Sequence, residues 1–286
     1  LNDYLNIKHV NFLDKLSLNG KKVGVFGSMN LPPNKKFNIY IPDPWSLSST
    51  DKSFSSKNVN YTLKFLVNNN AKLKINFKSL VGLMFLFGFP NYNKIKIIFK
   101  ILLSFYKKER AKLSAYFDYL FFDYSLRRVK SNKLDFSLIF LNGLAHVQHH
   151  YLLNSEFLST KKNPDWYISK EKDPIYESLL IYDKLFERLF IPKTLLELWV
   201  VTGLTQEPEK TPKIYWRFNN HKKIFNYFFK FDFEINPLMT RDFEIKVNDI
   251  IYLDQIINFL NQAKIRVFKN NQIHKAFGHI NKNSKF

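Results

Sequence analysis

Apolar residues along this chain follow two patterns, short continuous runs and longer stretches with helical spacing. Continuous runs of this length are typical of strands that are covered on both faces in a parallel sheet. They occupy residues 22–27, 135–141 and 195–201. Apolar positions at intervals of three and four predict helices instead. These stretches are residues 5–18, 61–131, 173–190, 221–229 and 249–263. With a further strand expected around residues 241–247, the alternation of strands and helices favours an α/β fold with a mainly parallel sheet.

The helical stretch at residues 61–131 is far longer than the dozen or so residues that a crossover between parallel strands needs. We therefore expect an α/β/α sandwich with a mainly parallel central sheet and an inserted helical cap. The α/β core would comprise residues 1–60 and 132–286, incomplete at both ends, and the cap residues 61–131. Prolines in the segment 41–46 predict an extended, ordered loop there.

The cap mixes phenylalanine and lysine, which leaves two interpretations open. The residues concerned are Phe85, Phe87, Phe89, Phe99, Phe105, Lys94, Lys96, Lys100, Lys107 and Lys108. Apolar stripes on helices usually pack into a core, which is the preferred interpretation. The alternative is an amphipathic element that lies on a membrane surface.

The chain is strongly basic, with 44 Lys and Arg against 24 Asp and Glu. A charge of this sign can indicate nucleic-acid binding when it coincides with a motif and one face of the fold. Here the lysines are spread along the chain, and the 30 Phe and 15 Tyr suggest a bias toward A/T-rich codons. We therefore expect a charged, solvated surface and no specific nucleic-acid partner.

Other compositional features narrow the chemistry. No apolar run reaches the roughly 18 to 20 residues that cross a bilayer, and any signal segment would lie before Leu1. The chain contains no cysteine, which excludes disulfides and thiolate metal sites. A metal site would therefore use nitrogen and oxygen ligands, and the composition is compatible with a bacterial cytoplasm, the favoured location.

The richest candidate site follows the apolar run at residues 135–141. Asn142 and Gly143 turn the backbone there, and His146, His149 and His150 follow closely. Imidazoles suit metal binding or proton transfer, and the carboxyl ends of strands are where open α/β sheets bind ligands. Packing and capping of a helix start is the structural alternative for the same residues.

Four segments, in this order, resemble the alkaline phosphatase superfamily, in particular its type I phosphodiesterase, nucleotide pyrophosphatase and sulfatase-like branch. They are KKVGVFGSMNLPP, LIFLNGLAH, DPIYESLLIYDKLFERLF and LELWVVTGLTQEP. The resemblance implies that His146 takes the position of a metal-binding histidine, while Asn142 stands where the family carries aspartate. Residues 201–203 replace the family's Asp-His metal pair, and the hydroxyl nucleophile would lie before Leu1.

The resemblance also implies a divalent metal, zinc or manganese, and hydrolysis of a phosphate or sulfate ester. His149 and His150 could replace missing ligands or act as acid and base. We expect five further residues to lie around the same site, namely Glu207, Arg217, His221, Arg241 and Asp242. Of these, Arg217, His221 and Arg241 are the candidate substrate-binding residues. His274 or His279 could fill the role of a late histidine ligand.

Two functions follow as expectations. The first is a phosphodiesterase- or sulfatase-like hydrolase that acts on a small-molecule or glycan ester through a partial or altered metal site. The alternative is a catalytically degenerate relative that serves as a glycan- or partner-binding module, which the loss of three expected ligands favours.

Overall fold

The computed structural model describes most of the chain. The described residues are 10–29, 31–46, 48–68, 76–106, 111–157, 162–190, 197–203, 205–208, 218, 220–237, 242–267 and 272–282. Contacts divide the chain into two compact units, residues 1–213 and residues 214–286. The division into a core and a cap that we expected from the sequence is a different one and stays a prediction.

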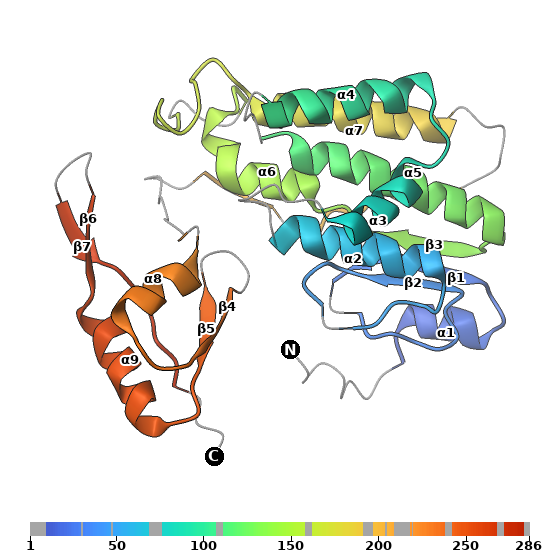
Figure 1. Ribbon diagram of the computed structural model, residues 1–286. Coiled ribbons are helices and arrows are strands. Elements are labelled where there is room, and N and C mark those ends of the chain that lie inside the picture. Colours follow the sequence, from blue (N-terminus) through green and yellow to red (C-terminus); the bar gives the residue numbers. More distant parts are fainter. Residues whose placement is uncertain are drawn as a thin grey trace. The chain divides into compact units, whose positions relative to one another are not determined.

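The first unit contains a parallel sheet with helices on both of its sides (Figure 1). Its strands are β1 (Val23–Ser28), β2 (Ile39–Pro42) and β3 (Phe136–Ile139), hydrogen-bonded in the order β2-β1-β3. Both pairings of β1 are parallel. The mixed α/β class and the mainly parallel sheet expected from the sequence are confirmed.

The two faces of this sheet are buried in different hydrophobic clusters. Val23 and Val25 pack with Leu13 of α1 (Phe12–Leu18) on one face. Phe26 and Ile39 belong to the larger cluster on the opposite face, which is built with the other helices. Alternate residues of a strand point to opposite faces, so this division follows from the strand geometry. Helices therefore flank both faces of the sheet.

The other helices of the first unit lie on the side of the second face (Figure 1). They are α2 (Phe54–Asn68), α3 (Phe77–Phe87), α4 (Tyr92–Tyr106), α5 (Leu113–Asn132), α6 (Gly143–Tyr151) and α7 (Pro174–Phe190), and a short 3-10 helix (Leu152–Asn154) follows α6. The helical spacing predicted for residues 61–131 is confirmed, although α2 begins earlier. No helix in the described ranges is long and apolar enough to cross a bilayer.

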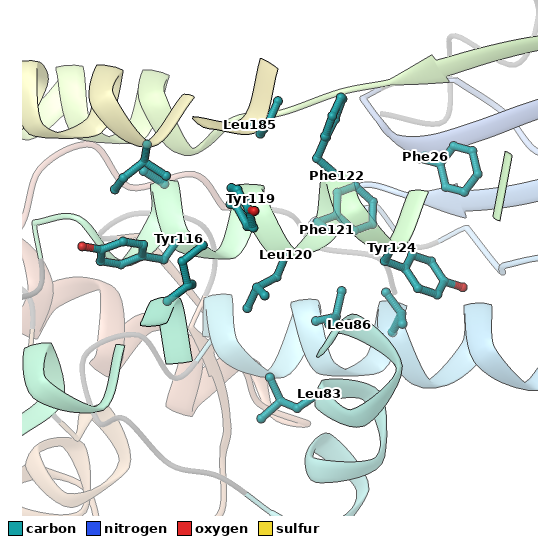
Figure 2. Close-up of a cluster of buried hydrophobic side chains, with 14 of the residues drawn as sticks. Phe26, Leu83, Leu86, Tyr116, Tyr119, Leu120, Phe121, Phe122, Tyr124 and Leu185 are labelled. Carbon is teal, nitrogen blue, oxygen red and sulfur yellow. The ribbon is translucent and has the colours of Figure 1, made fainter. Parts of the chain in front are cut away.

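Helix α5 lies at the centre of the large cluster (Figure 2). Its Tyr119 and Leu120 are buried, and Leu86 of α3 and Leu185 of α7 complete the same core. Gly82 lets α3 approach α2 closely, because a Cβ there would lie 2.3 Å from the Asn58 carbonyl oxygen. The central position of α5 explains why its polar residues need internal partners.

A buried ion pair and its hydrogen bonds join α3, α4 and α5. Lys94 Nζ of α4 lies 2.7 Å from the Asp123 carboxylate of α5, and both side chains are almost fully buried. The same ammonium group donates to the carbonyl oxygens of Phe87 and Phe89 at the end of α3. Arg127 adds a second cation beside Asp123 at 3.1 Å. The buried charges thus bind one another and the orphan carbonyls of a helix end.

The second unit contains α8 (His221–Phe228), β4 (Glu234–Pro237), β5 (Phe243–Lys246), α9 (Ile250–Gln262), β6 (Lys264–Val267) and β7 (Gln272–Lys275). β4 pairs with β5 and β6 with β7, both antiparallel. Phe225 of α8 and its C-cap residue Phe229 pack on Ile256 and Leu260 of α9. The helices and the strand expected in this part of the sequence are confirmed.

Two expectations about strands are wrong. Residues 197–201, the described part of the expected strand at 195–201, form no strand. Trp199 and Val201 are about four-fifths exposed there, at 78 % and 81 %. An apolar run becomes a strand only where a neighbouring strand accepts its backbone hydrogen bonds. Conversely, Ile41 and Pro42, the first two residues of the expected extended loop, form the end of β2, because this strand lies at the sheet edge where Pro42 is tolerated.

Candidate functional site

The carboxyl ends of three parallel strands meet at one edge of the central sheet. The chain passes from β1 to β2 on one side and then to β3 on the other, so the strand order reverses at β1. Ligands of open α/β sheets bind outside the carboxyl ends at such a point. Gly27 has a φ of 74°, and the pairing register shifts between Phe26 and Ser28. This irregularity turns the chain out of β1 at the edge where the candidate site lies.

Helix α6 begins directly after β3 at this edge. Asn142 is its N-cap residue, and its side chain makes no capping hydrogen bond. The N–H groups of the first turn have other partners: Gly143 N donates to Asp118 Oδ2 at 2.6 Å, and Leu144 N donates to the Tyr182 hydroxyl at 3.1 Å. The Tyr182 hydroxyl in turn donates to the Asp118 carboxylate. Side chains of α5 and α7 thus fix the start of the histidine helix.

Burial makes Asp118 unusual among carboxylates. It raises the pKa of Asp118 from 3.8 to about 6, and the hydrogen bonds from Tyr182 and Gly143 oppose that rise. The pKa of the Tyr182 hydroxyl is also raised, first by burial and then by the Asp118 charge, so this hydroxyl keeps its proton and remains a donor. Asp118, Tyr182 and the first N–H groups of α6 thus form a buried network in which each of these polar groups has a hydrogen-bond partner.

The histidines of α6 divide into a pair and a separate residue. The rings of His146 and His150 lie one helical turn apart with centroids separated by 4.8 Å. His150 Nδ1 and the Tyr167 hydroxyl share a hydrogen bond of 2.8 Å. His146 is half-buried, whereas His149 and His150 are both exposed. The structure therefore pairs the ring of His146 with that of His150 across one helical turn.

Both histidines of the pair are neutral at neutral pH. Burial, together with smaller contributions from the neighbouring His150 and His149, lowers the pKa of His146 to about 4. The pKa of His150 is lowered by partial desolvation and by His149. A neutral imidazole carries one donor and one acceptor nitrogen. The pair can therefore bind a metal ion or form hydrogen bonds with a ligand, and it is a weak base.

The segment 197–208 contacts the histidine helix. Gln206 Nε2 donates to the Ala145 carbonyl oxygen at 3.4 Å, whereas Glu207 is exposed. At the other end of α6, Asn163 Nδ2 donates to the His150 carbonyl oxygen at 3.1 Å and to Asn154 Oδ1 at 2.7 Å. Residues distant in sequence thus hold α6 at both ends.

Sequence reasoning missed Asp118, Tyr182, Tyr167 and Gln206. One signal was available for Asp118, because a carboxylate within the apolar stretch 113–124 needs an internal partner. Its partner could not be read from the sequence, since Gly143 and Tyr182 lie 25 and 64 residues away.

The remaining candidate residues lie in the second unit or outside the described residues. His221 is buried in the second unit, where its ring lies 5.1 Å from that of Phe243 and 5.7 Å from that of Phe218. Asp242, His274 and His279 are exposed in the same unit. Arg217 and Arg241, the other candidate substrate-binding residues, lie outside the described residues.

The described residues do not complete a metal centre. Within the described ranges, no group of three or more His, Cys, Asp or Glu side chains is placed to hold a metal ion. Asn142 and His146 supply two donor groups at the expected position, and zinc sites in proteins ordinarily use at least three protein ligands. The zinc or manganese implied by the resemblance therefore stays a prediction.

Comparison of the chain with family models, with curated proteins and with solved structures finds no match in any of the three. The resemblance to the alkaline phosphatase superfamily accordingly stays an interpretation of the four sequence segments.

Proposed function

We propose that this chain belongs to a hydrolase-like protein of the alkaline phosphatase superfamily that acts on a phosphate or sulfate ester. The reacting ester would lie at the carboxyl edge of the β2-β1-β3 sheet, beside Asn142 and His146. The substrate would be a small molecule or a glycan that carries the ester group.

One observation carries this proposal. The hydrogen bond from Gln206 to the Ala145 carbonyl oxygen joins the segment LELWVVTGLTQEP to the segment LIFLNGLAH. These segments lie 61 residues apart at the bond, and both take part in the resemblance. Their contact lies just after β3, at the carboxyl edge of the parallel sheet where α/β folds bind ligands, and this supports a shared site.

The side chains present would bind and orient an anionic ester. The neutral His146 ring offers a donor nitrogen to an ester oxygen, and the Asn142 side chain, which has no capping bond, offers an amide donor. The first two N–H groups of α6 already have partners, so the helix start itself is not available to an anion. Recognition would therefore rest on side chains.

A second candidate is a binding module that keeps the fold without turnover. The observation that favours it is the lack, in the described ranges, of a three-ligand metal group. Such a module would bind a phosphorylated or sulfated glycan at the same edge through the same Asn142 and His146 side chains.

Turnover and binding measurements separate these two candidates. Cleavage of p-nitrophenyl phosphate, bis(p-nitrophenyl) phosphate and p-nitrophenyl sulfate would be assayed with excess zinc or manganese, for the parent, His146→Gln and the exposed control Glu187→Gln. Turnover lost only in His146→Gln supports the hydrolase. Saturable binding of a phosphate ester without turnover supports the binding module. The absence of both contradicts each candidate.

A further inference from the structure

Helix α4 presents an apolar stripe to solvent. Tyr92, Ile95, Phe99, Leu102 and Tyr106 recur at intervals of three and four, and each is at least 56 % exposed. Side chains at this spacing lie on one face of an α-helix. Scattered exposed apolar residues are normal on soluble proteins, but a continuous stripe along four turns marks an interaction surface.

The opposite face of α4 already has its partners. Lys94, Ile97, Ile101 and Ser104 are buried there, with Lys94 held by Asp123 and Ile97 and Ile101 in the large hydrophobic cluster. Two faces of the same helix are thus apolar, and one of them suffices to hold it in the fold. The exposed stripe is therefore surplus to the packing of α4.

Lysines surround a cavity beside this stripe. The cavity has a volume of about 290 Å³ and lies between α4, α5 and α7, of which α4 and α7 run side by side in Figure 1. Its basic lining residues are Lys96, Lys100, Lys112 and Lys184, over an apolar floor that includes Ile97 and Ile181. Glu177 is the acidic lining residue, 2.6 Å from Lys112. Lys112 and Glu177 neutralise each other, so the net charge of the lining comes from the other three lysines.

The charge of this region is complementary to an anion. Desolvation lowers the pKa of Lys100, and Lys184, Lys96 and Lys112 lower it further. Mutual repulsion of this kind is relieved when an anion binds among the lysines. Helix α4 itself contains no acidic residue. A basic flank beside an apolar stripe is the arrangement of helices that lie in the interface of anionic membranes.

We propose that α4 docks the protein on the surface of an anionic phospholipid bilayer. The apolar stripe would enter the boundary between headgroups and acyl chains, and Lys96, Lys100 and Lys184 would contact headgroup phosphates beside it. This surface is separate from the residues of α6, so the proposal goes beyond the ester chemistry and stands or falls independently of it.

Vesicle co-sedimentation of the purified full chain tests this proposal. We expect binding to vesicles of phosphatidylcholine with phosphatidylglycerol, at least tenfold weaker binding to phosphatidylcholine alone, and loss of binding as salt is raised, because salt screens the lysine attraction. Equal binding to both vesicles, or binding to neither, would overturn the proposal.

Variants of α4 and matched control variants elsewhere test whether α4 is the surface that binds the vesicles. Phe99→Ser and the double variant Lys96→Gln/Lys100→Gln should each weaken binding to anionic vesicles at least fivefold. Tyr227→Ser and Lys223→Gln on α8 replace an exposed aromatic residue and an exposed lysine elsewhere, and should leave binding to anionic vesicles unchanged. Circular dichroism confirms that each variant is folded. If sedimentation velocity instead shows self-association that Phe99→Ser abolishes and lipid does not affect, the stripe is an interface between copies and the proposal fails.

Discussion

The Asp118 carboxylate on α5 accepts a hydrogen bond of 2.6 Å from the backbone N–H of Gly143, the first residue of α6. This bond fixes the helix that carries His146 and His150 to the centre of the hydrophobic core. Gly143 is required because a Cβ there would lie 2.6 Å from Asp118 Oδ2 and 2.6 Å from the Ser114 carbonyl oxygen. The hydrogen bond between the Gly143 backbone and the buried Asp118 carboxylate therefore positions the candidate site on α6.

Gly143→Ala should destabilise the protein, because the added methyl group forces α6 away from α5. We expect a loss of about 1 to 3 kcal/mol in the free energy of unfolding, the usual cost of overpacking, measured by urea denaturation. Gly203→Ala is the control, since a Cβ there meets no atom within 4 Å, and it should change stability by less than about 0.5 kcal/mol. Equal effects of the two substitutions would refute the proposed close contact.

Asp118 and His146 should give the stability opposite dependences on pH. The folded pKa of Asp118, about 6, lies above its unfolded value, so its contribution to stability falls as pH rises from about 4 to 6. The folded pKa of His146, about 4, lies below its unfolded value of 6.5, so its contribution rises with pH from about 4 to 6.5. Each effect amounts to at most about 3 kcal/mol.

Unfolding free energies from pH 4 to 6.5 in the metal-free protein separate the two. Relative to the parent, Asp118→Asn should gain stability as pH rises, and His146→Gln should lose it. A constant difference between each variant and the parent across this range would contradict the assigned pKa shifts.

Lys94→Met should destabilise the protein by about 3 to 5 kcal/mol, because it leaves the buried Asp123 with one cation fewer and two carbonyl oxygens of the α3 end without a donor. Chemical denaturation measures the loss. Lys96→Met, on the exposed side of the same helix, should cost less than about 0.5 kcal/mol. A loss below about 1 kcal/mol for Lys94→Met would show that the buried pair does not hold α4.

Zinc should bind only weakly at α6, because Asn142 and His146 supply two donors in the described structure. In calorimetric titrations we expect no tight stoichiometric binding, and chelation should leave the midpoint of thermal unfolding unchanged. Tight binding that persists in His146→Ala would place the metal elsewhere in the chain and contradict this assignment.

The sequence predicted those elements whose signal is local. β1 is a buried continuous apolar run, β3 is a half-buried one, and α7 begins at Pro174 within the stretch expected to be helical. β2 was missed because Pro42 opposes a central strand, although an edge strand tolerates it. The apolar run around Trp199 was misread because its exposure depends on tertiary partners that periodicity does not reveal.

The candidate site was predictable to the level of the histidine cluster. Its position after β3 follows from the apolar run and the turn at Asn142 and Gly143. The pairing of His146 with His150 follows from their spacing of four residues, which places both side chains on one face of a helix. The contacts from Asp118 and Tyr182 that fix the start of α6 come from other helices, so local sequence could not reveal them.

The most direct test of the proposed function is the rate of p-nitrophenyl ester cleavage by the parent protein and by His146→Gln, with excess zinc or manganese present. We predict turnover by the parent of at least one phosphate or sulfate ester, with kcat/KM reduced on the order of 100-fold or more in His146→Gln. Turnover that is unchanged in His146→Gln, or no turnover of any ester by the parent, would contradict the proposal that this edge of the sheet is a hydrolase site.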